Sequence, residues 1–176
     1  GRYWAMDRDQ RWERTERAYQ ALTKGVGHLI KTPEEIIEAS YESGITDEFI
    51  EPSLISSADG KPIGIIKDGD AVVFFNFRID RPRQLSRAFV FKDFEKDGSI
   101  KWDFDPYAIK YEKKHITDQG EKLTPTGFVR GAALSNLYFA TMTEYAKPLV
   151  DEGAKVSFPP QSVDMPLGRV ISESGL

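Results

Sequence analysis

The feature that most constrains the fold is a run of apolar residues at positions 71–77, AVVFFNF. A run of this kind, rich in β-branched and aromatic residues, is typical of a strand that is covered on both faces, as in an α/β sheet. A helix is predicted directly after it, because Leu85, Ala88 and Phe89 recur at helical spacing and would face inward. A strand that leads straight into a helix therefore forms the centre of the predicted fold.

The remaining segments repeat this alternation of helices and strands. The clearest helix start is TPEE at 32–35, which combines a capping threonine, proline at the first helical position and a glutamate three residues after the cap. Flanking helices over a mixed sheet, an α/β fold, are the architecture that this alternation predicts. Helices are predicted at 10–24, 33–43 and 167–173, buried strands at 137–142 and 155–158, and an irregular insertion at about 92–131.

The composition excludes several classes of function. The chain has 176 residues, enough for one domain with its own core. A net charge of −4 argues against a broad nucleic-acid-binding face, and no apolar run is long enough to cross a membrane. The absence of cysteine excludes disulfides, thiolate catalysis and cysteine-built zinc sites, and it fits a reducing cytoplasm.

The strand-to-helix junction is the strongest candidate for a binding site. Ligands of open α/β sheets bind beyond the carboxyl ends of strands, and helix N-termini attract anions. Arg78, Arg81 and Arg83 stand at this junction, and arginine holds phosphate or carboxylate through two parallel hydrogen bonds. Arg78 and Arg81 are three positions apart in a short loop, so both can reach one anion. The alternative is that these arginines pair with Asp80 and other surface acids.

A second charged cluster opens the chain, before the first predicted helix. It holds Arg2 and Arg8 together with Asp7 and Asp9, and it is either part of a site or a solvated segment that pairs with itself. The two histidines lack neighbours at metal-ligand spacing, and the sequence contains no serine elbow or glycine-rich phosphate loop. These residues predict an anion-binding α/β domain, with no catalytic residue and no metal site in this chain.

Two longer motifs coincide with the arginine-rich segments. Residues 1–12 read GRYWAMDRDQRW and closely resemble the signature GRYYAMDRDxRW of the cofactor-independent (2,3-bisphosphoglycerate-independent) phosphoglycerate mutases. Residues 68–81 read DGDAVVFFNFRIDR and look like the DGDAVxFxNFRxDR motif of the same family. Shorter matches follow at 143–145, 156–159 and 167–172, so the resemblance spans almost the whole chain.

The resemblance implies that this chain is a fragment of a two-domain enzyme. Residues 1–160 would be the later part of an inserted phosphotransferase domain, which clamps the substrate, and residues 161–176 a hinge segment leading toward the phosphatase domain. In this family the phosphatase domain carries a serine nucleophile and two manganese ions, whose ligands would lie outside this chain. We therefore expect both ends to be cut, no cofactor bound by the fragment, and no turnover by the fragment alone.

Carried over residue by residue, the resemblance implies that Arg2, Arg8, Arg78 and Arg81 bind the substrate. These arginines would hold the oxygens of 3-phosphoglycerate and 2-phosphoglycerate, which the intact parent would interconvert as an isomerase of glycolysis and gluconeogenesis. The expected partners are this substrate pair and the phosphatase domain of the same polypeptide, in a cytoplasmic monomer that binds neither nucleic acid nor membrane. Two alternatives stay open: a non-catalytic module that binds a small phosphorylated or carboxylated metabolite, and a purely structural or oligomerising domain.

Overall fold

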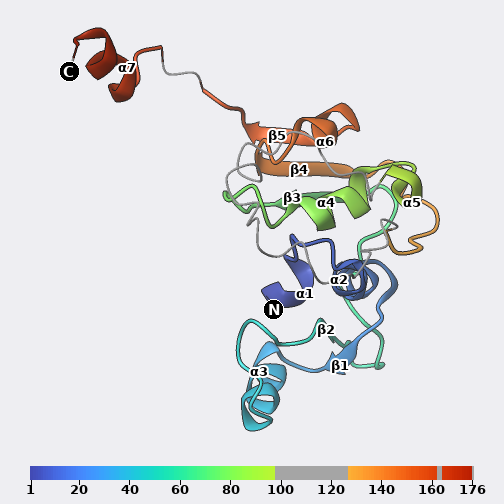
Figure 1. Cartoon of the computed structure of the whole chain (residues 1–176). Coiled ribbons are helices and arrows are strands. Elements are labelled where there is room, and N and C mark those ends of the chain that lie inside the picture. Colours follow the sequence, from blue (N-terminus) through green and yellow to red (C-terminus); the bar gives the residue numbers. More distant parts are fainter. Residues whose placement is uncertain (98–126, 162–163, 176) are drawn as a thin grey trace, which may run out of the picture.

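The structure of the protein is a computed structural model that describes residues 1–97, 127–161 and 164–175. Helices and strands alternate along the chain, as Figure 1 shows, so the predicted α/β class is confirmed. The elements are α1 (Arg2–Ala5), α2 (Trp12–Lys24), β1 (His28–Ile30), α3 (Pro33–Glu42), β2 (Ser53–Ile55), β3 (Ala71–Phe74), α4 (Arg83–Val90), α5 (Phe94–Asp97), β4 (Tyr138–Thr143), α6 (Lys147–Asp151), β5 (Lys155–Phe158) and α7 (Leu167–Glu173).

The strands form two separate parallel sheets. β3, β4 and β5 make a three-stranded sheet in that order, with Val72 opposite Phe139 and Thr141 opposite Val156. β1 and β2 form a second, two-stranded sheet. We expected a mixed sheet, but every strand pair named in the described ranges is parallel. Parallel pairing follows from the connections, because α4 lies between β3 and β4 and α6 between β4 and β5.

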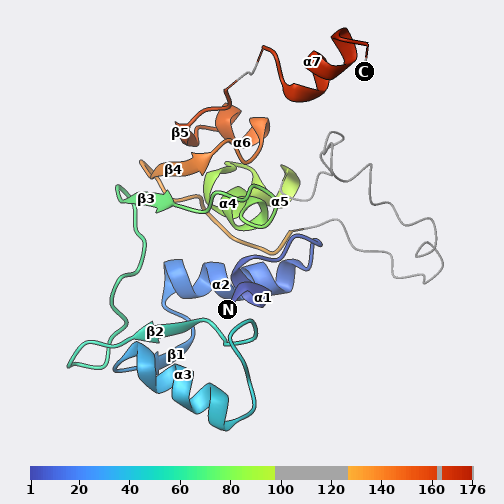
Figure 2. The same cartoon turned by 90° about the vertical axis from the view of Figure 1, so that its left-hand side faces the viewer.

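The elements stack in layers along the long axis of the molecule. Figures 1 and 2 both show, from one end to the other, the β3–β5 sheet, helix α4, helix α2, the β1–β2 pair and helix α3. Contacts between α2 and α4 join the β3–β5 end of the molecule to the β1–β2 end, and α1 packs on α2. Helix α7 stands apart from these layers in both views, with Leu167, Val170 and Ile171 exposed.

The core lies between the large sheet and α2, and aromatic side chains fill much of it. Phe89 of α4 stacks on Phe139 of β4 with ring centroids 5.6 Å apart, and Tyr19 of α2 contacts the same Phe89 at 4.9 Å. Leu85, Ala88 and Phe89 are all buried, which confirms the inward face predicted for this helix. The helix behind the candidate junction is therefore anchored on both sides, by the sheet and by α2.

The first long helix begins later than predicted. We expected it from residue 10, whereas α2 begins at Trp12. Gln10 has a φ of 61°, a left-handed conformation that cannot continue into a right-handed helix. The start of α2 is therefore set by a turn that reverses the backbone between the two segments.

The strand predicted at 71–77 is shorter and more exposed than expected. β3 ends at Phe74, and Val72 and Phe74 pack against the core, whereas Val73 is 59% and Phe75 77% exposed. The prediction that both faces of this strand are covered is therefore wrong. Helices α4 and α6 contact each other and contribute to the same core, so the described helices beside this sheet cover one face of it.

The predicted insertion and the predicted domain division are not tested by the described residues. The irregular insertion expected at about 92–131 lies mainly outside them, and its described ends are α5 and the segment from residue 127 onward. Among the described residues, no helix combines the length and apolar character needed to span a membrane. The domain division at residue 160 stays a prediction.

Candidate functional site

The two charged loops singled out in the sequence meet in the structure. One loop leaves the carboxyl end of β3 and enters α4, and the other links α1 to α2. The Arg8 guanidinium donates a hydrogen bond to Asp80 across this boundary and forms an ion pair with it. The Arg81 guanidinium donates to the backbone oxygen of Met6 at 3.1 Å. Arg8 and Arg81 are therefore held in adjoining loops, beyond the end of β3.

Asp80 neutralises part of the positive charge at this boundary. The alternative interpretation of the sequence pairs Asp80 with the junction arginines, whereas in the structure it pairs with Arg8, 72 positions earlier. Partial burial alone would raise the pKa of this carboxyl, but the hydrogen bond and charge of Arg8, together with backbone N–H donors, lower its pKa below the ordinary value. Asp80 is therefore ionised at neutral pH and holds the two loops together.

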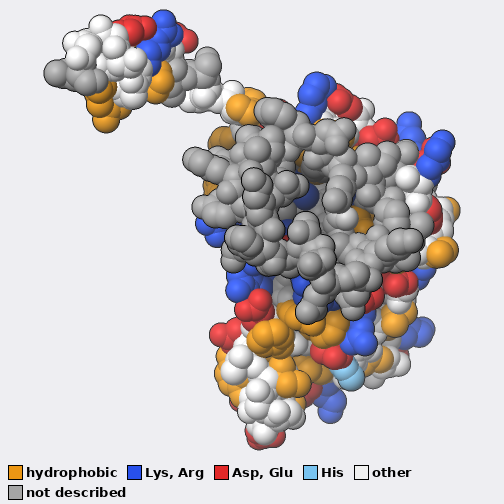
Figure 3. All heavy atoms as spheres, viewed as in Figure 1, with side chains coloured by type: hydrophobic (Ala, Val, Ile, Leu, Met, Phe, Trp, Pro, Cys, Tyr) orange, Lys and Arg blue, Asp and Glu red, His pale blue; other side chains and the backbone are white. Residues whose placement is uncertain are grey.

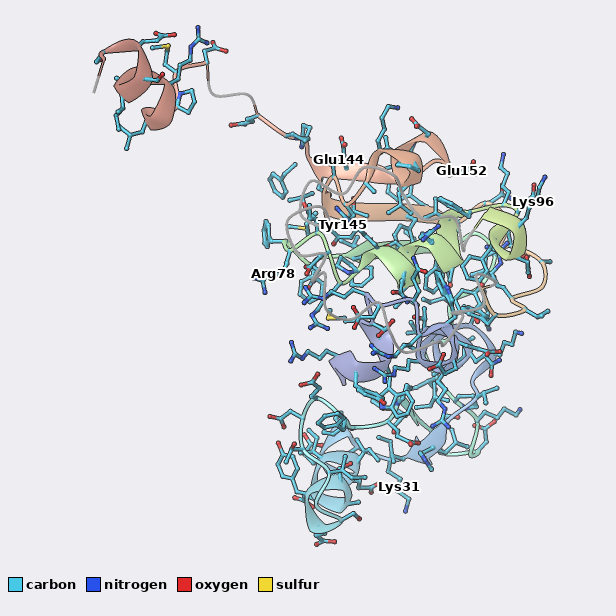
Figure 4. The ribbon with its side chains drawn as sticks, viewed as in Figure 1. Lys31, Arg78, Lys96, Glu144, Tyr145 and Glu152 are labelled. Atoms are coloured by element: carbon cyan, nitrogen blue, oxygen red, sulfur yellow. The ribbon has the colours of Figure 1, made fainter. Side chains whose placement is uncertain are left out.

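Arg78, like Arg8, is an exposed arginine. It lies beyond the end of β3, and Figure 4 shows it at the margin of the molecule. Among the residues that the structure describes, none forms a hydrogen bond or ion pair with its guanidinium. Figure 3 shows Lys and Arg side chains at this margin and at several other places on the same face. We refer to Arg8, Arg78 and Arg81 as the arginine cluster, which combines permanent positive charge with donors open to solvent.

Arg2 occupies a different position. The N-terminal loop predicted from the sequence contains a short helix, α1, and Arg2 in this helix pairs with Glu48 at 2.9 Å. The backbone N–H of Tyr3 donates to the oxygen of Glu48 at 3.1 Å, and Trp4 Nε1 donates to the oxygen of Phe49 at 3.0 Å. No contact found among the described residues joins Arg2 to the arginine cluster. The structure thus places three of the four predicted substrate residues in the two adjoining loops and holds the fourth against the segment before β2.

Contacts made by Tyr145, two positions after the end of β4, fix the loop that carries Arg78. The Tyr145 hydroxyl lies 2.6 Å from the backbone oxygens of both Phe74 and Asn76. Arg83 Nε donates to the backbone oxygen of Tyr145 at 2.7 Å. Arg83, which the sequence places among the junction arginines, therefore has a structural contact at the start of α4.

A buried polar pair that was not predicted from the sequence lies next to the two segments that carry Arg8 and Arg81. Asp7 and Gln84 are each 4% exposed, and Gln84 Nε2 donates to Asp7 Oδ2 at 3.0 Å. Gln84 also donates to Thr15 Oγ1 at 3.1 Å and accepts from the backbone N–H of Gln10 at 2.9 Å. The sequence holds a signal for this pair, because Gln84 stands four positions before Ala88 and so falls on the buried face of α4.

The described residues do not form a metal site. Among them, no group of three or more His, Cys, Asp or Glu side chains is arranged to hold a metal ion. His28 lies at the surface with Nε2 3.3 Å from Oε2 of Glu51, and His115 lies outside the described residues. The side chains in the described ranges therefore do not fit a bound manganese ion.

Comparisons with known proteins point to one family. The family model described as BPG-independent PGAM N-terminus matches residues 1–147. A 2,3-bisphosphoglycerate-independent phosphoglycerate mutase of Chloroflexus aggregans is 43% identical over 176 residues, which cover 100% of this chain and 30% of that protein. One of Moorella thermoacetica is 44% identical over 176 residues, with 100% of this chain and 28% of that protein covered.

A solved structure agrees with these sequence matches. The structure of Leishmania mexicana phosphoglycerate mutase at low cobalt concentration aligns with a TM-score of 0.65 and 26% sequence identity. The alignment covers 100% of this chain and 27% of that chain. The chain thus spans between 27% and 30% of the length of these relatives.

Proposed function

Since this chain belongs to the family of BPG-independent phosphoglycerate mutases, we propose that it is the substrate-binding part of an enzyme that interconverts 3-phosphoglycerate and 2-phosphoglycerate. The observation that carries the proposal is the ion pair between Arg8 and Asp80, which joins two arginine-bearing loops that are 72 positions apart. Phosphoglycerate carries both a phosphate and a carboxylate, so its recognition requires several permanent positive charges close together. The arginine cluster has this chemistry.

In this proposal the arginine cluster anchors the substrate and neutralises its charge. Each guanidinium offers planar N–H donors that match two oxygens of a phosphate or carboxylate. Arg78 offers its donors to the anion directly, and Arg8 exchanges part of its contact with Asp80 for a contact with the substrate. Arg2 binds the substrate once its ion pair with Glu48 has been broken. Donors held in fixed loops lower the entropic cost of orienting the substrate and stabilise charge that develops during transfer.

We assign the phosphoryl-transfer chemistry to the parent polypeptide outside this chain. The described residues contain no metal-binding cluster, and the family resemblance implies a serine nucleophile and two manganese ions in a separate phosphatase domain. That domain would be the partner of this one within a monomeric cytoplasmic enzyme of glycolysis and gluconeogenesis. This chain by itself would then show no mutase turnover.

The proposal is tested on the full-length parent in an enolase-coupled mutase assay with manganese and without 2,3-bisphosphoglycerate. Replacing both Arg78 and Arg81 with alanine should lower kcat/KM by about a hundredfold or more, because two charge-assisted contacts to the substrate are lost. The matched control is Arg17→Ala. Arg17 is an exposed arginine whose ion pair, with Glu51 at 3.2 Å, lies outside the arginine cluster.

Three outcomes separate the candidate functions. Unchanged kcat/KM in the double variant would refute the clamp. A folded parent that binds 3-phosphoglycerate in calorimetry but shows no mutase activity would favour a non-catalytic metabolite-binding module. A parent with neither activity nor binding would favour a structural or oligomerising domain.

A further inference from the structure

The buried pair of Asp7 and Gln84 connects the loop between α1 and α2 to the start of α4. Asp7 directly precedes Arg8 in the turn between α1 and α2, and Gln84 lies in the first turn of α4, three positions after Arg81. The hydrogen bond from Gln84 Nε2 to Asp7 Oδ2 spans 77 positions of sequence. The segments that carry Arg8 and Arg81 are thus joined by a buried hydrogen bond as well as by the more exposed ion pair between Arg8 and Asp80.

The same two side chains shape the turn that carries Arg8. Asp7 Oδ2 accepts from the backbone N–H groups of Asp9 at 3.1 Å and Arg11 at 2.9 Å. Gln10 has a φ of 61°, a conformation that residues with a side chain keep only where surrounding contacts impose it. Its N–H donates to Gln84 Oε1, so the amide of Gln84 secures the strained residue directly.

The burial and charge of Asp7 indicate a positioning role and not a chemical one. Asp7 Oδ1 lies 3.8 Å from a guanidinium nitrogen of Arg11 and 3.7 Å from one of Arg14, which balance its charge. A carboxylate that is buried, accepts three hydrogen bonds on one oxygen and has two guanidinium groups beside the other is suited to hold structure and not to bind a ligand or act as a base. Gln84, equally buried, is fully engaged with Asp7, Thr15 and Gln10.

We propose that Asp7 and Gln84 are positioning residues that set the spacing between Arg8 and Arg81 in the anion clamp. The proposal rests on the proposed function, because it assumes that these arginines bind the substrate. The mechanism is geometric: the amide of Gln84 fixes the turn of Arg8 against the helix that begins directly after Arg81. A displacement of about 1 Å between two such donors is enough to lower activity by about a hundredfold.

The test is a double-mutant cycle in the full-length parent between Gln84→Met and Arg8→Ala. Methionine keeps the length of glutamine but removes every hydrogen bond that its amide makes. If Gln84 acts through Arg8, the change should lower kcat/KM by about tenfold in the wild-type background and by about twofold or less when Arg8 is already alanine. Most of the loss should appear in KM, because an anchoring contact to the substrate is weakened.

Gln20→Met is the matched control. It is the same substitution on a partly buried glutamine of α2, whose Nε2 donates to Glu16 Oε1 at 2.8 Å. This contact lies within α2 and touches neither loop, so the substitution should leave kcat/KM unchanged. Should Gln84→Met fail to fold, Gln84→Asn enters the same cycle, since it keeps an amide but retracts it from Asp7. Equal losses in both backgrounds, with Arg8→Ala itself strongly impaired, would overturn the positioning role alone. An Arg8→Ala variant with full activity would instead overturn the role of Arg8 in the proposed clamp.

Discussion

Two regions of the molecule bury very different amounts of surface. The upper layers consist of the β3–β5 sheet, α4 and α2, and the lower unit consists of β1, α3 and β2. In α4, six of the eight residues are buried, and they meet aromatic side chains from both sides. In α3 the buried residue is Ser40, while Ile37 is 40% and Tyr41 51% exposed. Yet α3 has the clearer start signal in the sequence, and it begins at the predicted Pro33 although the Thr32 side chain makes no capping hydrogen bond. Local signals thus decide where a helix forms, whereas tertiary packing decides how strongly it is held.

The largest expected effect tests the packing of the upper layers. Phe89→Ala should lower the free energy of unfolding by about 3–5 kcal/mol, because it empties the space between Tyr19 and Phe139. Urea denaturation followed by tryptophan fluorescence measures this loss. A loss below about 1 kcal/mol would mean that the upper layers are not the tightly packed part of the molecule.

The second effect concerns a buried arginine, Arg130, whose guanidinium contacts the end of α4. Arg130 is 3% exposed and donates to the backbone oxygens of Ala88 at 2.9 Å, Phe91 at 2.5 Å and Lys92 at 2.7 Å. Arg130→Met keeps the length of the side chain but leaves buried carbonyls without a donor, so we expect a loss of about 2–3 kcal/mol in urea denaturation.

Arg17→Met provides the comparison for this second effect. It removes an exposed arginine that pairs with Glu51, next to the lower unit, and lies over the ring of Trp4 at 4.7 Å, and it should cost about 1 kcal/mol or less. Equal losses for the two arginines would show that burial of Arg130 contributes nothing beyond an ordinary surface pair.

The sequence predicted the parts of the fold that depend on local pattern. Periodicity located α4 and its buried face, and the apolar runs located β4 and β5. The exposed face of β3 was not predictable in this way, because an apolar run shows that a strand is suited to burial and not what covers it. The conformation of Gln10 was equally hidden, since it depends on a hydrogen bond to Gln84, 74 positions away.

The candidate site shows the same division. The arginines were recognisable from their motifs, and the meeting of the Arg8 and Arg81 loops fits the rule that ligands bind beyond strand ends. The partners of these residues were not predictable, because each is set by side chains distant in the sequence. Arg2 pairs with Glu48, and the buried Asp7 contacts Gln84, only once the layers have packed.

A third prediction uses pH to test how much the ion pair between Asp80 and Arg8 stabilises the fold. The folded-state pKa of Asp80 lies below the ordinary 3.8, so its pair with Arg8 stabilises the fold above the unfolded pKa and loses this effect as pH falls through the folded pKa. Asp80→Asn should therefore lower stability by up to about 1 kcal/mol at pH 7, a modest value because the pair is partly solvated. The difference from wild type should close as the pH falls below 3.8.

Urea denaturation at a series of pH values measures this difference. Glu48→Gln is the control in the segment next to the lower unit, because it removes the more exposed pair with Arg2 and should change stability less. A gap between Asp80→Asn and wild type that stays constant down to pH 2 would show that the ionised Asp80 carboxylate does not stabilise the contact between the loops.

The smallest expected effect lies in α3. Ile37→Ala should change the free energy of unfolding by less than about 0.5 kcal/mol, because the apolar surface lost from a side chain already 40% exposed is partly offset by the higher helix propensity of alanine. Leu85→Ala, the same kind of truncation at a buried position of α4, should cost at least about 2 kcal/mol in the same urea experiment. A loss near 2 kcal/mol for Ile37→Ala would instead mean that packing holds α3 as firmly as α4. The two regions would then differ in the exposure of their side chains but not in how strongly their helices are held.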